Sequence, residues 1–168
     1  MAVHQTVHTA ADGADIVAFP RVDTSGPPTL MKGTPVSADE NIQAAVDGYA
    51  AFGRGDIAAI LAVLTDDVEW INPGPPDVIP GAGTHRGKEA VGAFFGTLAE
   101  SAEFQVFEPR EFIAQGDKVV ALIYSESTAR STGRHVVDHA AHLWTFRDGK
   151  VAGFQVFQDT AALVAAYG

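Results

Sequence analysis

The sequence of 168 residues contains no cysteine. This absence excludes disulfide bridges, thiolate nucleophiles and zinc sites built on cysteine sulfur. Basic residues are also few: 11 lysines and arginines stand against 21 aspartates and glutamates, so the formal net charge is −10. Because that charge repels phosphate groups, we expect neither nucleic acid nor a membrane surface as a partner.

Long hydrophobic runs are missing as well. No stretch approaches the about 18 apolar residues that a membrane-spanning helix needs. Residues 1–20 have neither the basic start nor the apolar centre of a secretory signal peptide. A cytoplasmic location is the resulting expectation. Hydrophobic residues nonetheless make up 46% of the chain, which is enough for one domain with a sizeable core.

The chain divides into two parts by composition. Residues 1–36 are rich in Thr, Gly, Pro and Asp, and only the stretch 15–19 could form a short strand. We interpret residues 1–36 as an N-terminal arm that is flexible or lies on the domain or on a partner subunit. Residues 37–168 carry regular helical and strand patterns and are predicted to form one domain.

Helical patterns precede strand patterns in this domain. Ser37 and Glu40 fit a capping box at the start of the first helix, and Asp56 and Asp159 are predicted to cap two further helices. The Pro/Gly-rich segment 73–87 is predicted to be an irregular loop. The predicted helices cover 38–52, 56–64, 88–101 and the last residues, and the predicted strands cover 68–72, 104–114, 118–129, 135–146 and 151–158. This order predicts the α+β class, with helices packed on one face of an antiparallel sheet.

One predicted strand carries three of the six histidines. Alternate residues of a strand share a face, so Asp138, His142 and Trp144 point one way while His135 and His139 point the other. Asp138 and His142 lie about 13 Å apart at roughly 3.3 Å per residue, which is too far for ligands of one metal ion. We therefore expect no metal here, and exposed His135 and His139. His142 is either a core histidine or a pocket histidine.

Several strings resemble the SnoaL-like branch of the nuclear transport factor 2-like superfamily, which includes ketosteroid isomerases, polyketide cyclases and limonene epoxide hydrolases. The strings are DDVEWINPGPP, AGTHRGKEAVGAFFGTLAE, FEPREFIAQGDKVV, TGRHV and FRDGKV…FQDTAALVAA, and the resemblance covers roughly residues 38–167. It implies a cone-like α+β fold in which a curved antiparallel sheet and three packed helices enclose an apolar pocket, usually in a homodimer.

The resemblance carries over only part of the known catalytic sets. The general-base aspartate of the isomerases corresponds to Asn72, which cannot take a proton at neutral pH, and their protonated aspartate aligns with His142. Their oxyanion tyrosine falls at Gly48, next to Tyr49, which is either a pocket or a core residue. The epoxide hydrolases use a Tyr-x-Asn pair where this chain has Trp70 and Asn72. An ordinary steroid isomerase is therefore not expected, and epoxide hydrolysis is an alternative.

The candidate site follows from strand alternation together with this resemblance. Its candidate catalytic residues are His142, Asp138, Asn72 and Glu126, and its candidate substrate-binding residues are Trp70, Tyr124, Trp144, Tyr49 and Phe154. A carboxylate in an apolar cavity and a histidine can both exchange protons near neutrality. Glu126 could instead be a solvated strand end, and a one-residue slip would turn Asp138 outward.

Our leading hypothesis is a cofactor-free enzyme that isomerises or cyclises a hydrophobic polyketide- or terpenoid-like small molecule, by aldol-type or epoxide-opening chemistry. No glycine pattern matches a nucleotide-binding loop, so no cofactor is expected. The alternatives are an epoxide hydrolase and a non-catalytic ligand-binding or dimerisation module. The outward residues Val137, Ala141 and Leu143 are apolar, which predicts that a second subunit covers them in a homodimer.

Overall fold

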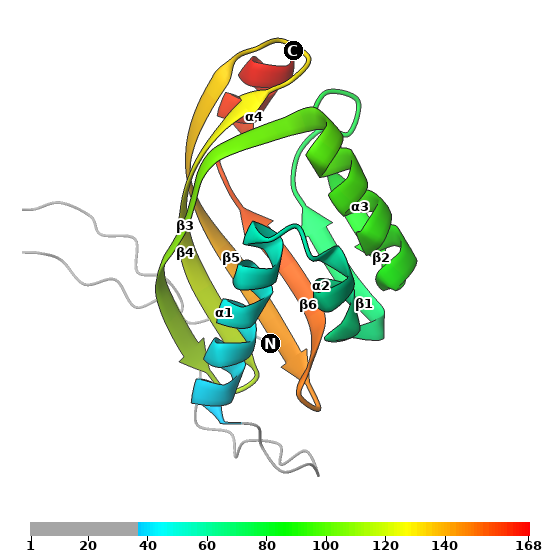
Figure 1. Ribbon diagram of the computed structural model, residues 1–168, viewed down its shortest axis with the longest axis vertical. Coiled ribbons are helices and arrows are strands. Elements are labelled where there is room, and N and C mark those ends of the chain that lie inside the picture. Colours follow the sequence, from blue (N-terminus) through cyan, green and yellow to red (C-terminus); the bar gives the residue numbers. More distant parts are fainter. Residues whose placement is uncertain (1–36) are drawn as a thin grey trace, which may run out of the picture. The chain divides into compact units, whose positions relative to one another are not determined.

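The computed structural model describes residues 37–168, so the predicted arm at 1–36 lies outside the described residues. The described part combines helices with one six-stranded sheet (Figure 1). The helices are α1 (Ala38–Gly53), α2 (Ile57–Ala62), α3 (Gly87–Ser101) and α4 (Thr160–Tyr167). The strands are β1 (Leu64–Asn72), β2 (Gly83–Arg86), β3 (Ala102–Gln115), β4 (Lys118–Ala129), β5 (His135–Arg147) and β6 (Lys150–Phe157).

Three helices begin at the caps that the sequence predicts. The Ser37 hydroxyl accepts a hydrogen bond from the Glu40 backbone N–H at 3.2 Å, and the Glu40 carboxylate accepts one from the Ser37 N–H at 2.8 Å. The Asp56 and Asp159 carboxylates each accept a backbone N–H from the first turn of their helix, both at 3.0 Å. These bonds satisfy N–H groups that have no partner inside a helix, so local sequence fixes where α1, α2 and α4 start.

The sheet has the order β2-β1-β6-β5-β4-β3 and corrects two sequence predictions. The end of the supposed loop forms strand β2, which pairs antiparallel with β1. Strand β1 pairs parallel with β6 rather than antiparallel. The α3 helix and the β3–β4–β5 meander lie between them in the chain and provide the long connection that parallel neighbours need. The pairs β3–β4, β4–β5 and β5–β6 are antiparallel, as predicted.

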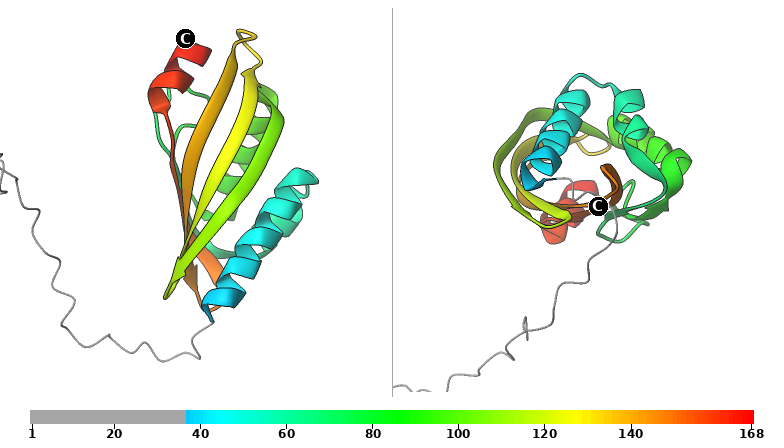
Figure 2. Two further views of the ribbon diagram at one scale, coloured as in Figure 1. Left: turned by 90° about the vertical axis from the view of Figure 1, so that its left-hand side faces the viewer. Right: turned by 90° about the horizontal axis from the view of Figure 1, so that it is seen from below.

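The sheet curls, and α1, α2 and α3 lie against its concave side (Figures 1 and 2). This agrees with the predicted cone of a curved sheet and three packed helices, while α4 lies at one end beside the β4–β5 turn. The core lies between helices and sheet and is strongly aromatic. Trp70 on β1 stacks on Phe154 of β6 with ring centroids 3.8 Å apart, and Phe95 of α3 meets the Trp70 ring edge-on at 5.4 Å.

The convex side of the sheet carries apolar side chains that no other described element covers. Leu122 on β4 pairs with Ala141 on β5, which pairs with Phe157 on β6, so the three form a row across the sheet. Leu122 is 38% exposed and Phe157 is 50% exposed, and Val137 nearby on β5 is 49% exposed. We call these four residues the convex apolar patch. Among residues 37–168, no helix is both long and apolar enough to cross a membrane.

Candidate functional site

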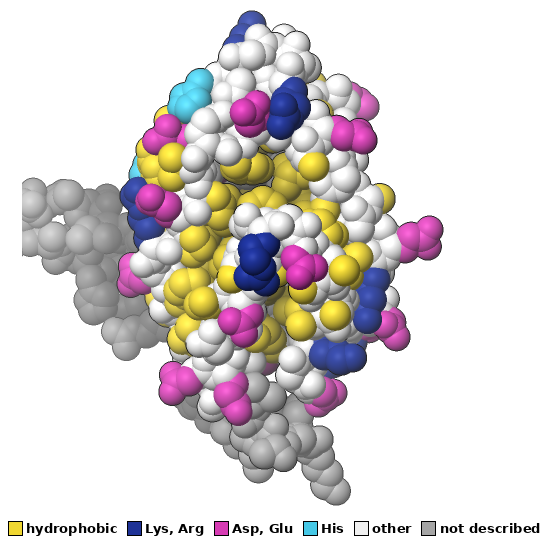
Figure 3. Space-filling model, in the orientation of Figure 1, with side chains coloured by type: hydrophobic (Ala, Val, Ile, Leu, Met, Phe, Trp, Pro, Cys, Tyr) yellow, Lys and Arg dark blue, Asp and Glu magenta, His cyan; other side chains and the backbone are white. Residues whose placement is uncertain are grey.

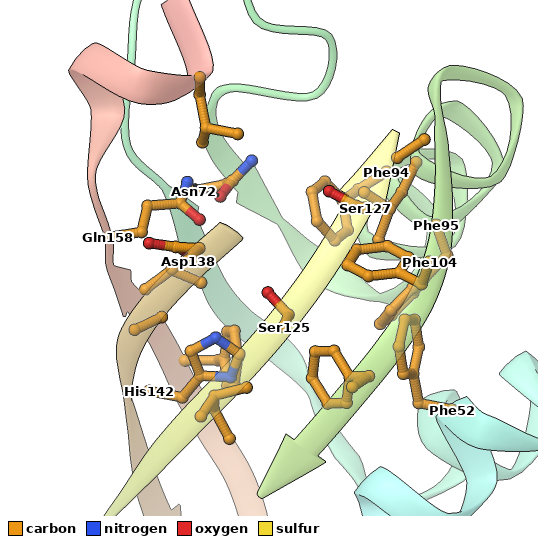
Figure 4. A pocket seen from close by; sticks show the side chains of 18 of the residues that line it. Phe52, Asn72, Phe94, Phe95, Phe104, Ser125, Ser127, Asp138, His142 and Gln158 are labelled. Atoms are coloured by element: carbon orange, nitrogen blue, oxygen red, sulfur yellow. Dashed lines mark hydrogen bonds between the residues drawn. The ribbon is translucent and has the colours of Figure 1, made fainter. Parts of the chain in front are cut away.

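A cavity lies between the concave side of the sheet and the helices. Hydrophobic side chains gather around a hollow on the helix-bearing face of the protein (Figure 3). The close view in Figure 4 separates two walls by chemistry. The aromatic wall includes Phe52, Phe94, Phe95 and Phe104, and the polar wall comprises Asn72, Asp138, His142 and Gln158. Ser125 of β4 lies between the two walls, and Ser127 lies beside the phenylalanines. Such a cavity suits a flat apolar molecule with oxygen atoms along one edge.

His142 projects from β5 into this cavity and is only 8% exposed. Its Nδ1 atom lies 3.0 Å from the Tyr49 hydroxyl oxygen, which also accepts a hydrogen bond from the Trp144 indole N–H at 2.9 Å. Burial lowers the pKa of His142 from 6.5 to about 4. Burial also raises the pKa of Tyr49, against a smaller lowering by the Trp144 hydrogen bond. Both groups are therefore neutral at pH 7.

The close approach of α1 to β5 explains why the tyrosine occupies position 49. Gly48 faces the Trp144 ring so closely that a Cβ atom there would lie 3.0 Å from Cη2 of the indole. A side chain at position 48 would press on the Trp144 ring. The next residue, Tyr49, instead reaches along the cavity wall to His142.

Asp138 supplies the carboxylate of the polar wall. Its Oδ1 atom accepts the Asp159 backbone N–H at 3.3 Å, at the start of α4. No described residue forms a hydrogen bond with the other carboxylate oxygen, Oδ2, and this atom is not fully buried. A second carboxylate oxygen thus remains available to a ligand. It can accept a hydrogen bond or a proton.

Asn72 and Gln158 form a second polar group in the wall. Gln158 donates from Nε2 to the Asn72 side-chain oxygen at 3.1 Å, and Asn72 donates from Nδ2 to the Gly81 carbonyl at 3.4 Å. These bonds hold the Asn72 amide in one orientation, with one amide hydrogen left over. Asn72 can position a ligand oxygen, but an amide cannot carry a proton between atoms.

Seven of the nine residues in the candidate site line the cavity. They are Tyr49, Trp70, Asn72, Asp138, His142, Trp144 and Phe154. Their chemical roles stay predictions.

Tyr124 and Glu126 are not among the lining residues, so the prediction that they face the pocket is wrong. Ser125, between them, stands opposite Asp138 and faces inward, which turns both neighbours to the convex side. There the Tyr124 hydroxyl donates to Glu126 at 2.5 Å, and the Arg110 guanidinium lies 4.0 Å over the Tyr124 ring. The hydrogen bond to Glu126, followed by desolvation, raises the pKa of Tyr124.

Two histidines on β5 also lie on the convex side. His135 and His139 are exposed, as predicted. The His135 Nε2 atom lies 3.5 Å from a Glu126 oxygen, and the His139 ring packs against Tyr124 with centroids 5.2 Å apart. Within residues 37–168 no three His, Asp or Glu side chains converge as metal ligands would.

Comparison with known proteins identifies the family. The model of the SnoaL-like domain matches residues 45–154, which is more than half of the chain. The chain belongs to the SnoaL-like family. No protein of curated function matches it.

Solved structures support the same family and the wider nuclear transport factor 2-like fold. An NTF2-like protein from Burkholderia xenovorans LB400 is 39% identical, with 79% of this chain and 98% of that chain covered and a TM-score of 0.73. An NTF2-like protein of unknown function from Burkholderia pseudomallei K96243 is 30% identical, with 76% and 97% covered and a TM-score of 0.69. TerC, co-crystallised with polyporic acid, is 32% identical, with 76% and 98% covered and a TM-score of 0.69.

The cavity of this SnoaL-like protein includes polar residues that sequence reasoning missed. Ser125, Ser127 and Gln158 all line it, and so do the phenylalanines of the aromatic wall. The inward position of Ser125 follows from the pairing of β4 with β5, which sets it opposite the inward Asp138. Gln158 follows the last strand directly, and nothing in its local sequence marks it as a cavity residue.

Proposed function

We propose that this SnoaL-like protein is a cofactor-free enzyme that moves protons on a hydrophobic, oxygenated small molecule, and so isomerises or cyclises it. The observation that carries the proposal is the pairing of a carboxylate and a neutral imidazole on one wall of an aromatic cavity. An apolar molecule would bury its faces against the phenylalanines. Its oxygen atoms would meet the polar wall.

Asp138 is the proposed base because it has a carboxylate oxygen free of hydrogen bonds within the described chain. It removes a proton from a carbon that is conjugated with a carbonyl group, giving the Asp138 carboxylic acid and an enolate. In isomerisation the acid returns that proton to another carbon of the conjugated system. In aldol-type cyclisation the enolate carbon attacks a second carbonyl group, and the acid protonates the new alkoxide.

His142 is the proposed partner of the enolate oxygen. A neutral imidazole can donate a hydrogen bond without having to release a proton, and such a donor stabilises the negative charge that develops. Asp138 and His142 lie four residues apart on one strand, or about 13 Å between Cα atoms at roughly 3.3 Å per residue. The substrate is therefore expected to be extended, with its acidic carbon and its carbonyl oxygen joined through conjugation.

Polyporic acid, the molecule present in the TerC crystal, is the first probe for this proposal. The chain contains two tryptophans, Trp70 and Trp144, and both line the cavity. Their fluorescence is therefore expected to fall as polyporic acid binds. Ser125→Leu replaces a hydroxyl that lines the cavity with a larger apolar group and should weaken binding about 10-fold, which is roughly 1.4 kcal/mol.

The matched control is Ser131→Leu, which makes the same change at an exposed position in the β4–β5 turn and should bind as the wild type does. A time-dependent change in the absorption of the bound molecule would indicate turnover. Tight binding with no turnover of this or related conjugated carbonyl compounds would favour the ligand-binding module instead. Absence of quenching would count against a ligand of this class.

We also propose a homodimer through the convex apolar patch of Leu122, Val137, Ala141 and Phe157. Leu122→Glu or Phe157→Glu would place a charge in a buried interface and should give a monomer at micromolar concentration. Light scattering would measure this. Val63→Glu is the control, because Val63 is 41% exposed but lies after α2, outside the patch. A wild-type protein that is monomeric at that concentration would disprove the dimer.

A further inference from the structure

The hydrogen bonds around His142 determine which of its ring nitrogens carries the proton. The chain of contacts runs from the Trp144 indole to the Tyr49 hydroxyl at 2.9 Å, and from that hydroxyl to Nδ1 of His142 at 3.0 Å. An indole N–H can only donate, so the Tyr49 oxygen accepts at this end. Within residues 37–168, Nδ1 of His142 is the other group within hydrogen-bonding distance of this hydroxyl.

Two proton arrangements are conceivable, and one of them leaves a buried group unpaired. If Nδ1 carried the proton, the Tyr49 oxygen would accept two hydrogen bonds while its own hydrogen had no acceptor in the described chain. Leaving a buried donor without a partner costs free energy. If Nδ1 is unprotonated, Trp144 donates to Tyr49 and Tyr49 donates to Nδ1, so the hydroxyl has a partner on both sides and only the N–H on Nε2 is left for a ligand. Burial keeps Tyr49 protonated by raising its pKa and keeps His142 neutral by lowering its pKa to about 4.

A neutral imidazole without a proton on Nδ1 carries it on Nε2. Within the described residues Nε2 has no hydrogen-bond partner, and it is not fully buried. Because His142 lines the cavity, a ligand in the cavity can contact this nitrogen. Figure 4 shows the ring projecting into the space between the two walls. The free N–H of His142 therefore points where a ligand would lie.

We propose that Tyr49 is a positioning residue, which together with Trp144 locks His142 in the tautomer protonated on Nε2, so that this site requires a ligand with a hydrogen-bond acceptor there. The acceptor is an oxygen of the carbonyl, enolate or phenolate class. A ligand whose hydroxyl group can only donate here would direct its hydrogen at the imidazole N–H. Such a ligand is not expected to bind. The tautomer assignment stands on the protein alone, and only the ligand class rests on the proposed function.

The chain of donors also strengthens the last one. Each hydrogen bond in a series polarises the next, so a tyrosine that donates to Nδ1 makes the N–H on Nε2 a better donor. The partner of one ring nitrogen commonly sets the state of the other in histidine sites. The close fit of Gly48 against Trp144 supports this arrangement, because it brings α1 near enough for Tyr49 to reach both rings.

Nitrogen-15 NMR tests the assignment directly, since protonated and unprotonated ring nitrogens of neutral imidazole resonate far apart. At pH 7 we expect wild-type His142 to show a protonated Nε2 and an unprotonated Nδ1, with His142→Gln identifying the signals. A protonated Nδ1, or the averaged signals of two exchanging tautomers, would overturn the proposal. Saturation with polyporic acid should shift the Nε2 proton, and bound ligand without any shift would overturn the assignment of the ligand class.

Tyr49→Phe removes the donor to Nδ1 and should move both nitrogen signals toward the averaged position. Tyr124→Phe is the matched control, because it removes a hydroxyl on the convex side beside His139 and should leave His142 unchanged. If Tyr49→Phe leaves the signals in place, Tyr49 does not set the tautomer. If circular dichroism shows that Tyr49→Phe does not fold, Trp144→Phe is the deciding variant. Loss of the indole N–H should likewise raise the population of His142 that is protonated on Nδ1. An unchanged population would refute the proposed role of Tyr49 and Trp144.

Kinetics add a readout that a purely structural role would not give. On any substrate that the wild type converts, Tyr49→Phe should lower kcat about 10-fold with KM little changed, and Tyr124→Phe should change neither. A rise in KM alone would contradict positioning. If the NMR result is as expected but no conjugated carbonyl compound is converted, the proposed function fails while the tautomer assignment stands.

Discussion

Asp138→Asn is expected to lower turnover by roughly 10²–10⁴-fold, the usual effect of removing a general base. His142→Ala is expected to lower it by roughly 10²–10³-fold, the effect of losing one donor to a developing oxyanion. Each change removes a group that the cavity presents to the ligand, while the aromatic wall that supplies most of the binding remains. The affinity for ligand should therefore change far less than kcat.

The two strands provide a matched control for each variant. Glu126→Gln neutralises a carboxylate on the convex side of the neighbouring strand, and His139→Ala removes an exposed histidine from the same strand as His142. Both should retain turnover close to that of the wild type. If Glu126→Gln and His139→Ala are inactive while the two inner variants are active, the cavity is not the catalytic site and the proposed function is wrong.

Stability should fall as the pH decreases from about 6.5 toward 4, because His142 is buried in its neutral form. Its pKa is lowered to about 4 in the folded chain, while an unfolded chain has the ordinary value of 6.5. Between these values the unfolded state binds more protons than the folded state, so the free energy of unfolding rises with pH. Above about pH 6.5 the contribution of neutral His142 to the free energy of unfolding is almost fully present. The total loss on acidification is about 3 kcal/mol, at 1.36 kcal/mol per pKa unit.

Urea unfolding at pH 7 and pH 5 would measure this effect before most carboxylates become protonated. At pH 5 the contribution of His142 to the loss is about 2 kcal/mol by the same linkage. His142→Gln lowers stability at both pH values, since Tyr49 loses its acceptor, but it should remove that pH-dependent part. Equal pH dependence in the wild type and in His142→Gln would show that His142 is not desolvated as described.

The sequence by itself determined the features that depend on neighbouring residues. The caps at Ser37, Asp56 and Asp159 need only a side chain and the first turn of a helix. The sequence also predicted the inner face of β5, because turn residues mark both ends of this strand and alternation puts Asp138, His142 and Trp144 on one side of it.

The sequence could not predict which face of strand β4 lies toward the cavity. Val119, Ala121 and Ile123 occupy one face and Val120 and Leu122 the other, so apolar alternation favours neither face. The pairing with β5 decided the matter, since it sets Ser125 opposite Asp138 and so turns the residues on either side of Ser125 outward. A one-residue difference in register exchanges the two faces of a strand completely.

Only the tertiary structure brought Tyr49 to His142, which lies 93 residues away in the chain. The sequence could place Tyr49 on a helix and His142 on a strand, but not the approach of the helix at Gly48 that joins them. The neutrality of His142 is likewise a property of the fold, since its pKa is lowered by desolvation. Propensity, capping and alternation act over a few residues, whereas hydrogen-bond partners and desolvation depend on packing between distant segments. For that reason most of the residues that the sequence proposed for the site do line the cavity, whereas the fold decided their chemical state.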